Sequence, residues 1–294
     1  MWSKQGLILS PQKNLKWMQS HAMLPTVEHI QGDNYRVYFS GRNSDNVSLI
    51  GYAIIRVNNG KIKTISYNSE PILSPGERGC FDDNGVTPSC IVEDKLYYIG
   101  WNSGTTTYRM SLIMGLALKE QGVFRRHSRA PLMKKTDREP FGICTAPFVI
   151  KDKNLYKMWY VSGEGWIHRD LPRYNIKHAY SLDGIEWHRD GKAAVDLLDG
   201  ETALARPCVV KNGQEYEMYF SYKVPEIGYR IGLAKSSNGI VWNRTNQVVL
   251  DVSKEGWDSE MVQYSYVFRH NNIDYMLYNG NGYGKTGIGY AIRK

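Results

Sequence analysis

Two stretches of this sequence repeat each other: "AYSLDGIEWHR" at residues 179–189 and "AKSSNGIVWNR" at residues 234–244. Each copy places Asp-Gly or Asn-Gly between apolar residues. This is the strongest short signal for a β-hairpin, because these residues tolerate positive φ. Each copy therefore predicts a strand, a tight turn and a second strand that carries Trp187 or Trp242. We interpret these two tryptophans as packing residues between structural repeats rather than as ligand contacts.

The same periodicity extends over the whole chain. Segments that run from a proline into a tyrosine-rich strand begin at Pro25, Pro88, Pro147 and Pro207, and a fifth begins at Ser265. Their starts lie 63, 59, 60 and 58 residues apart. A second pair of strands follows each segment, so each repeat holds about four strands in about 60 residues, which is typical of a β-propeller blade. A repetitive β-sandwich is the alternative.

The fifth repeat stops at its third strand, "GIGYAIRK". The chain begins with "KQGLILSP", which resembles the fourth-strand segments "SEPILSPGERG" and "RAPLMKK" of earlier repeats. We therefore predict an all-β, five-bladed β-propeller that forms one domain over residues 1–294. In it an N-terminal strand near residues 6–10 closes the last blade beside residues 287–292, so that no strand edge stays unpaired at the seam.

Composition narrows the class of ligand. The 294 residues include 37 Lys and Arg against 29 Asp and Glu, a formal charge of +8, and 21 Tyr and 8 Trp against 7 Phe. Tyrosine and tryptophan suit half-exposed strands and clefts that stack flat ligands. The charge indicates either a solvated basic surface or an anionic ligand such as a phosphate, a sugar nucleotide or an acidic sugar. Nucleic acid is not expected as a partner, because the basic residues are scattered and no nucleic-acid module is recognisable.

The cysteines and the N-terminus bear on compartment and cofactors. Cys80, Cys90, Cys144 and Cys208 lie far apart, without metal-ligand spacing, and no glycine-rich phosphate loop is recognisable. We therefore expect no metal, no cofactor and a reducing compartment. Because no apolar run has the length of a signal peptide or a membrane span, we expect a cytoplasmic protein without membrane insertion. The sequence leaves the oligomeric state open.

Carboxylates recur where the first strand of each repeat begins. In a propeller these strands line the axis, so side chains just before the aligned starts meet in one funnel. The carboxylates are Asp82 and Asp83, Glu139, Glu201, and Asp258 and Glu260, while the first repeat has His21 instead. Carboxylates around an aromatic funnel suit glycosidic-bond chemistry, in which one protonates the leaving oxygen and another activates water or attacks the anomeric carbon.

From these positions we predict a set of site residues. We expect Asp83, Glu201 and Glu260 to be catalytic, with Glu201 as the acid and all three facing one axial pocket. The residues expected to bind substrate are His21, Arg42, Asp82, Trp101, Glu139, Trp166, His168, Arg206 and Asp258. Trp166 stands in the polar loop "SGEGWIHRD" and is either a platform for a sugar ring or a packing residue.

Together these motifs resemble the five-bladed glycosidase superfamily, which includes glycoside hydrolase families 32, 43, 68 and 130. The patterns "FDDNGVTPS", "YRIGLAKSSNGIVW", "WDSEM" and "YNGNGYG" are most similar to uncharacterised glycosidase-like proteins of bacterial surface-polysaccharide gene clusters. The resemblance covers essentially the whole chain. It implies a propeller fold and glycoside hydrolase or phosphorylase chemistry.

The sequence departs from the resemblance at one position that matters. Families 32 and 43 place a catalytic Asp where the first repeat begins, and here that segment reads "SHAMLP". The resemblance would put their second Asp at Asp82 or Asp83 and their acid at Glu139. Family 130 contains phosphorolytic enzymes, in which basic residues hold a phosphate nucleophile. His21, Arg42, His168 and Arg206 are the residues that such a site would use here.

Three functions follow as hypotheses. The first is an enzyme that cleaves or transfers a glycosyl group in bacterial polysaccharide metabolism, with a carbohydrate or sugar-phosphate substrate. The second is a sugar-binding propeller without catalysis, and the third is a protein-interaction scaffold. Carboxylates separated by about 5–10 Å across the funnel would favour the enzyme, and a broad apolar face without them would favour the scaffold.

Overall fold

The computed structural model describes residues 1–245 and 247–294. Within them nearly every regular element is a β-strand, and the one helix, α1 (Asn281–Gly284), has four residues. The predicted all-β class is therefore confirmed.

Within the described residues the strands form two four-stranded sheets and one twelve-stranded sheet. The twelve-stranded sheet consists of three antiparallel groups of four, connected by two short parallel pairings. Each antiparallel group of four corresponds to one predicted repeat. We keep the word repeat for these groups and number them in chain order from one to five. Repeat one contains β2 (Ser20–Gln31), β3 (Asn34–Arg42), β4 (Ser48–Asn58) and β5 (Lys61–Tyr67). Repeat two contains β6 (Val86–Val92), β7 (Lys95–Ser103), β8 (Met110–Glu120) and β9 (Val123–Arg126).

Repeats three to five follow the same order of strands. Repeat three contains β10 (Ile143–Asp152), β11 (Leu155–His168), β12 (Leu171–Ser181) and β13 (Ala193–Val195). Repeat four contains β14 (Ala203–Asn212), β15 (Glu215–Val224), β16 (Gly228–Ser236) and β17 (Asn243–Arg244). Repeat five contains β18 (Gln263–His270), β19 (Ile273–Asn279), β20 (Ile288–Arg293) and, from the other end of the chain, β1 (Ser3–Leu9).

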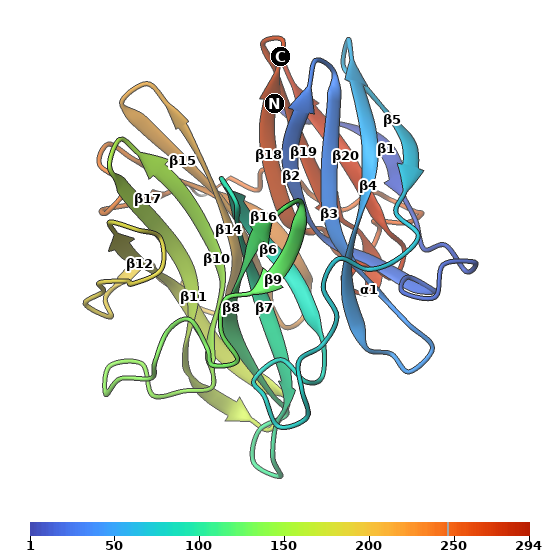
Figure 1. The fold of residues 1–294 in the computed structure, drawn as a ribbon. Helices are drawn as coiled ribbons and strands as arrows, with labels where there is room; N and C mark the ends of the chain where they lie inside the picture. Colours follow the sequence, from blue (N-terminus) through green and yellow to red (C-terminus); the bar gives the residue numbers. More distant parts are fainter. Residues whose placement is uncertain (246) are drawn as a thin grey trace.

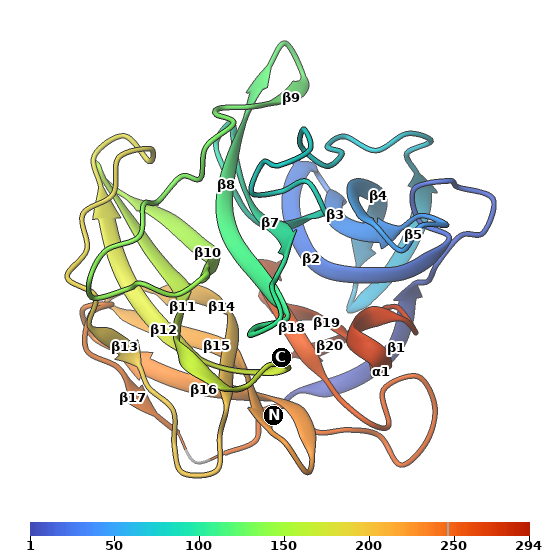
Figure 2. The ribbon, with the colours of Figure 1, turned by 90° about the horizontal axis from the view of Figure 1, so that it is seen from below.

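The first strands of the repeats meet in the middle of the molecule. β2 contacts β6, β6 contacts β10, β10 contacts β14, β14 contacts β18, and β18 contacts β2 again. Figure 2 looks towards this middle and shows the repeats set around it. A residue that immediately precedes or begins a first strand is therefore brought near its counterparts from the other repeats.

The two ends of the chain lie side by side in the fifth repeat (Figure 1). β1 pairs antiparallel with β20, with Ser3 opposite Ile292 and Gly6 opposite Tyr290. The predicted pairing of the N-terminal strand with the last strand is thus confirmed. Lys4 also forms a 2.7 Å ion pair with the buried Asp258, so β1 contributes both backbone pairing and a charge to this repeat.

The duplicated sequence stretches form two matching turns. Ser181 Oγ accepts hydrogen bonds from the backbone N–H groups of Asp183 and Gly184, and Asp183 Oδ1 accepts from two further N–H groups. Ser236 and Asn238 make the same contacts in the second copy. Short polar side chains that bond to nearby backbone in this way stabilise turns.

Each of these turns docks on the preceding repeat. Tyr97 donates its hydroxyl to the carbonyl of Gly184 at 2.7 Å, and Trp159 donates its indole N–H to the carbonyl of Gly239 at 2.8 Å. Trp187 packs edge-on against Tyr97 at 6.1 Å, and Trp242 against Trp159 at 5.8 Å. The interpretation of both tryptophans as packing residues between repeats is confirmed, and it explains why the motif recurs.

Candidate active site

A central cavity of about 390 Å³ lies where the first strands approach one another. Four first strands supply equivalent residues to its lining: β2 supplies Leu24, β10 supplies Ala146, β14 supplies Arg206 and β18 supplies Tyr264. Each of these residues immediately precedes the position from which the repeats were aligned. A recessed, few-per-molecule cavity of this size is the usual place for a small-molecule site.

The backbone is strained at these four positions. Leu24, Ala146, Arg206 and Tyr264 have φ values of 56°, 46°, 52° and 57°. The pairing register of each first strand with its neighbour shifts at the same place, as it does at a β-bulge. A bulge redirects side chains, and non-glycine residues at positive φ cost on the order of 1–3 kcal/mol and gather at functional sites. The same bulge and the same strain thus recur at equivalent positions of four repeats and turn these residues towards one cavity.

Arg206 crosses the floor of the cavity. Its side chain is 1% exposed and donates to the carbonyls of Pro88 and Pro25 at 2.9 and 2.6 Å and to Thr26 Oγ1 at 2.8 Å. It thereby ties repeat four to repeats one and two. All of these acceptors are neutral, and burial lowers the pKa of the Arg206 guanidinium to about 10. The floor therefore carries a buried positive charge that no carboxylate within the described chain neutralises.

Other cations face the same cavity. Arg42 at the end of β3, Arg109 just before β8 and Lys223 on β15 line it together with Arg206. Among the described residues that line the cavity, Asp170 is the single carboxylate, and its Oδ1 is paired with Arg169 at 3.1 Å. The lining is therefore strongly cationic.

The remaining lining combines tyrosine hydroxyls with aliphatic side chains such as Ile99, Leu112 and Val161. Tyr174 and Tyr229 share a 2.7 Å hydrogen bond between their hydroxyls, and burial raises the pKa of Tyr174 to about 12. Tyr264, Tyr283 and the indole of Trp101 also line the cavity. These groups are neutral donors and acceptors on flat apolar rings, which is the combination that sugar hydroxyls and sugar rings require.

Four of the predicted carboxylates lie inside the repeats instead of facing the cavity. Asp82, Glu139, Glu201 and Asp258 are each at most 8% exposed, and each bonds to a cation from the outer part of its own repeat. The cations are Arg126, Arg189, Arg244 and Lys4, at distances of 2.8, 3.0, 2.6 and 2.7 Å. None of the four carboxylates is among the described residues that line the cavity.

Three of these four carboxylates are also held by tyrosines of the second strands. Tyr98 donates to Asp82, Tyr160 to Glu139 and Tyr278 to Asp258, at 2.9, 3.0 and 3.0 Å. We call each carboxylate with its cation a repeat lock. The recurring carboxylates that the sequence predicts to converge on one site lie in these repeat locks, where burial favours a carboxylate that is paired with a cation.

The first repeat has an apolar version of the lock. A Cβ on Gly41 of β3 would meet Met18, just as a Cβ on Gly100 of β7 would meet Asp82. Met18 is fully buried. On the other side of this repeat Tyr67 pairs with Ala53, where Arg126 pairs with Ala117 in repeat two. Met18, two residues before "SHAMLP", thus takes the place of a lock carboxylate, and this repeat uses an apolar packing solution.

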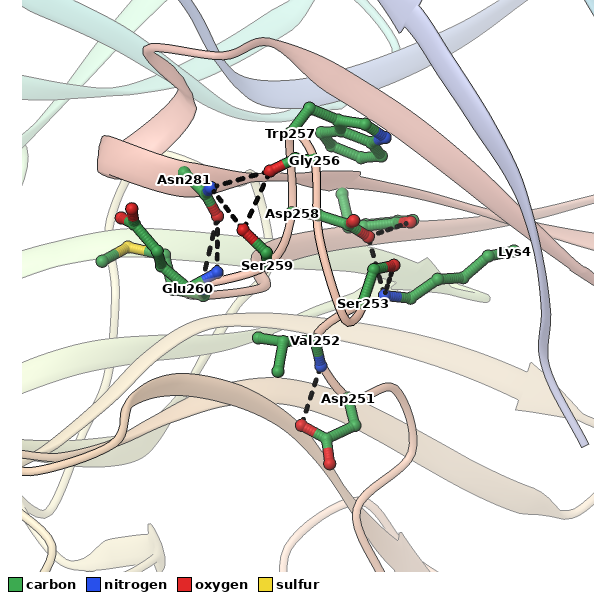
Figure 3. A network of polar contacts seen from close by, with 12 residues as sticks. Lys4, Asp251, Val252, Ser253, Gly256, Trp257, Asp258, Ser259, Glu260 and Asn281 are labelled. Atoms are coloured by element: carbon green, nitrogen blue, oxygen red, sulfur yellow. Dashed lines mark hydrogen bonds and ion pairs between the residues drawn. The ribbon is translucent and has the colours of Figure 1, made fainter.

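The remaining two predicted carboxylates also lie outside the cavity lining. Asp83 accepts hydrogen bonds from the backbone N–H of Gly79 and from Asn102 Nδ2, at 2.9 and 2.8 Å. Asn102 itself lines the cavity, so Asp83 stands one side chain behind it. Glu260 is exposed, and only its backbone is anchored, through Asn281 Oδ1 at 2.8 Å (Figure 3). The structure therefore does not bring Asp83, Glu201 and Glu260 together in one pocket.

Of the other predicted binding residues, Arg42, Trp101 and Arg206 line the cavity. His21 is half-buried, and burial together with the nearby Arg42 and Lys285 lowers its pKa to about 4. Trp166 packs against Tyr108 with ring centres 5.6 Å apart. His168 is exposed at the end of β11, where its Nδ1 accepts the N–H of Asp170 at 3.3 Å.

Sequence reasoning missed several lining residues. They include Arg109, Thr145, Asp170, Tyr174, Lys223, Tyr229, Tyr264 and Tyr283. Ala146, Arg206 and Tyr264 directly precede aligned starts, so the position next to Pro147, Pro207 and Ser265 was a usable signal. Arg109 and Asp170 stand on hairpin ends, for which the repeat pattern predicts no direction.

Three further observations concern the part of the chain that the structure describes. Within this described part, no helix is both long and apolar enough to cross a membrane. Across residues 1–245 and 247–294, no three His, Cys, Asp or Glu side chains are grouped so that they could hold a metal ion. The four cysteines are unpaired in the structure.

Comparison with known proteins gave close relatives in sequence. No family model matches the chain. Two Mycobacterium tuberculosis proteins, the uncharacterized proteins MT1551 and Rv1502, are each 40% identical to it over 299 residues. The alignments span 99% of this chain and 98% of each relative.

Solved structures share the fold at lower identity. A glycoside hydrolase has a TM-score of 0.73 at 19% identity, over 99% of this chain and 91% of that protein. β-1,2-Mannobiose phosphorylase from Listeria innocua in complex with β-1,2-mannobiose has a TM-score of 0.67 at 12% identity, over 94% and 90%. A thermostable family-43 glycoside hydrolase has a TM-score of 0.65 at 14% identity, over 93% and 89%. The chain thus has a propeller-like fold that glycoside hydrolases and a phosphorylase share.

Proposed function

This chain belongs to the family of the mycobacterial proteins MT1551 and Rv1502, and from that premise we propose that it is a carbohydrate-active enzyme. The proposed reaction is cleavage or transfer of a glycosyl group in the central cavity. The observation that carries the proposal is this cavity itself, with its strained first-strand residues and its lining of tyrosines, Trp101 and hydrogen-bonding side chains. The setting we propose is bacterial polysaccharide metabolism.

The architecture we propose is a single domain in which the five repeats are the five blades of a closed propeller. The cyclic contacts of the first strands and the pairing of β1 with β20 support it. Closure matters for function because it fixes the cavity walls relative to one another, so that residues from different repeats hold a ligand in one geometry.

Glycosyl transfer needs a proton donor and a nucleophile. When the bond between the anomeric carbon and the glycosidic oxygen breaks, the leaving oxygen takes up a proton from the acid, and the acceptor oxygen forms the new bond to the anomeric carbon. A water or sugar hydroxyl returns its own proton to the carboxylate that the acid has become, whereas an unprotonated phosphate oxygen has no proton to lose. We assign the role of proton donor to Asp170, because it is the one carboxylate among the described lining residues. The nucleophile is then an acceptor that enters with the substrate, namely water, phosphate or a second sugar.

Substitution of the two candidate acids separates this assignment from the sequence-based one. Activity would be sought on a panel of nitrophenyl glycosides and sugar phosphates, with and without added phosphate. We expect Asp170→Asn to lower the turnover by about 10²–10⁴-fold, the contribution of a general acid. Glu201→Gln should lower stability but keep activity within about threefold, because Glu201 forms a lock with Arg244.

If Glu201→Gln lowers the turnover strongly and Asp170→Asn does not, the proton donor is Glu201, as the sequence predicts. Asp83→Asn and Glu260→Gln belong in the same series, since their catalytic roles stay a prediction. If no variant of these carboxylates changes an activity that the wild type shows, the chemistry does not lie in this cavity.

A sugar-binding propeller without catalysis is the second candidate. The observation that favours it is that Asp170 is unaccompanied, since glycosidases use two carboxylates about 5–10 Å apart. This candidate predicts that sugars raise the melting temperature of the protein while no glycoside or sugar phosphate is turned over. Detection of any product that depends on Asp170 would exclude it.

A further inference from the structure

We infer that the cavity contains a phosphate subsite, formed by the guanidinium groups of Arg42 and Arg109 above the charged floor at Arg206. The inference rests on the proposed function and deepens it, because it assigns the substrate or the acceptor to a chemical class. The ligand is a tetrahedral phosphate group, either free inorganic phosphate or a phosphate that a sugar carries.

Arg42 and Arg109 form the first part of this subsite. Arg42 ends β3 and donates to Asn46 Oδ1 at 2.9 Å, a neutral acceptor. Arg109 precedes β8, and its backbone N–H is fixed to the carbonyl of Arg169 at 2.9 Å. Within the described chain neither guanidinium forms an ion pair with a carboxylate.

The two guanidiniums also repel each other. Burial is the main cause that lowers the pKa of Arg42; Tyr264 opposes this shift, and the positive charge of Arg109 adds to it. Like charges that share a recess without a counter-ion are unfavourable, and they become favourable when an anion lies between them. Elsewhere in this chain half-buried arginines such as Arg189, Arg244 and Arg293 are paired with carboxylates. Among the described half-buried arginines, Arg42 is therefore the exception, because it has no carboxylate partner. Arg109 is exposed at the cavity and is likewise unpaired.

The floor of the cavity also has hydrogen-bonding groups without a partner. The Arg206 charge is buried against neutral acceptors, and its Nε has no hydrogen-bond partner among the described residues. Thr145, which also lines the cavity, has a buried Oγ1 that lacks a partner within the same residues. A buried charge or polar group without a partner is costly, so an anion above this floor would recover part of that cost.

Phosphate fits these donors better than a carboxylate does. Guanidiniums bind both anions through paired N–H groups, but the donors here come from β3, from the segment before β8 and from β14. Donors that surround a ligand from several elements match the oxygens of a tetrahedral dianion, whereas a planar carboxylate presents two oxygens on one side. Tyrosines beside the cations leave room for the sugar that the phosphate is attached to or attacks.

The test compares ligand-induced stabilisation in wild type and charge variants. Melting temperature would be measured with inorganic phosphate, with sugar 1-phosphates and 6-phosphates, and with glucuronate, each against sodium chloride at the same ionic strength. The variants are Arg42→Gln and Arg109→Gln. Arg125→Gln is the matched control, because Arg125 is 70% exposed on β9 and lies outside the cavity lining.

We expect phosphate or a sugar phosphate to raise the melting temperature of wild type and of Arg125→Gln by several degrees. Arg42→Gln and Arg109→Gln should lose this shift. Without ligand, Arg109→Gln should melt at the wild-type temperature or above it, because one of two repelling charges is gone. A structural role for Arg109 predicts instead a lower melting temperature and an unchanged phosphate shift.

Stabilisation by inorganic phosphate alone would identify a free acceptor, and stabilisation by sugar phosphates only would identify a group on the substrate. Either result supports the subsite. No shift beyond the chloride control, a shift that both arginine variants retain, or a shift with glucuronate only would overturn it. Turnover of neutral glycosides without any phosphate effect would leave the proposed function standing and remove the subsite. A rise in melting temperature with phosphate, but with no sugar and no sugar phosphate, would support the subsite and remove the proposed function.

Discussion

The acidic groups inside the repeats and the basic groups around the cavity are opposite solutions to the same problem of burying charge. Each lock carboxylate has a cation within 3.0 Å, and most have a tyrosine hydroxyl as well. The cavity holds Arg42, Arg109, Lys223 and Arg206, with Asp170 as the single carboxylate among its described lining residues. A buried charge that is paired within the protein indicates a structural role, whereas a charge without a partner in the protein indicates a site for a charged ligand.

This difference changes where function is sought. Carboxylates that recur in every repeat attract attention as catalytic groups, yet recurrence is what a structural lock also predicts. The residues of a binding site instead differ from one repeat to the next, because a ligand does not have the symmetry of the repeats. Here the residues without such counterparts are Arg42, Arg109 and Asp170, which lie on different elements of repeats one, two and three.

Deletion of residues 1–10 should give the largest effect on the locks. It removes β1, unpairs the edge of β20 and takes Lys4 away from Asp258, which is 2% exposed. We expect a loss of at least about 4 kcal/mol in the free energy of unfolding, measured by urea titration. Lys4→Met keeps the paired strand, so its free energy of unfolding should fall by less than that of the deletion variant. A deletion variant as stable as wild type would show that the fifth repeat does not need this closure.

Glu139→Gln should give the next largest effect. It leaves Arg189 buried without its anion, and removing one partner of a buried pair costs about 3 kcal/mol or more. The double variant Glu139→Met with Arg189→Tyr copies the apolar packing of repeat one and should recover most of the loss. Glu77→Gln, at an exposed pair, is the control and should change stability by about 0.5 kcal/mol or less. Equal effects of the two single variants would contradict the lock.

The pKa of His21 reports the potential at the cavity rim. It is about 4 because of burial and of the charges on Arg42 and Lys285. Since this lies below the unfolded value of about 6.5, the contribution of neutral His21 to stability is complete above about pH 6.5 and is lost as the pH falls towards 4. In an NMR titration, Arg42→Gln and added phosphate should each raise the pKa of His21. An unchanged pKa in both cases would place His21 outside the field of the cavity.

Tyr283→Gly should give the smallest effect on stability and a clear one on binding. Tyr283 has a φ of 59° between Gly282 at 62° and Gly284 at 92°, and its side chain is 41% exposed at the cavity. Glycine relieves the strain but makes the unfolded chain more flexible, so the net change should stay within about 1 kcal/mol. Sugar binding should weaken because an aromatic face is lost. A large loss of stability with unchanged binding would assign Tyr283 to packing against Tyr229.

The repeat pattern predicts much of the fold but little of the site. Proline spacing and the Asp-Gly and Asn-Gly turns predict the strands, and the truncated fifth repeat predicts the pairing of β1 with β20, because both follow from local periodicity. The aligned carboxylates share a level in the repeats, but a β-strand alternates direction at every residue. A bulge at Ala146 or Arg206 changes that direction again, and no local pattern reveals it. Arg42, Trp101 and Arg206, which the sequence predicts as binding residues, do line the cavity, and their role in binding stays a prediction.

The most direct test is a crystal of the protein soaked with a sugar phosphate, compared with an unsoaked crystal by difference density. The account predicts density in the central cavity, with phosphate oxygens within hydrogen-bonding distance of Arg42 and Arg109 and the sugar ring against the tyrosines. The lock carboxylates should keep their cations unchanged. Density that instead joins Glu201, Asp83 or Glu260, or a ligand bound in solution that leaves the cavity empty in the crystal, would contradict it.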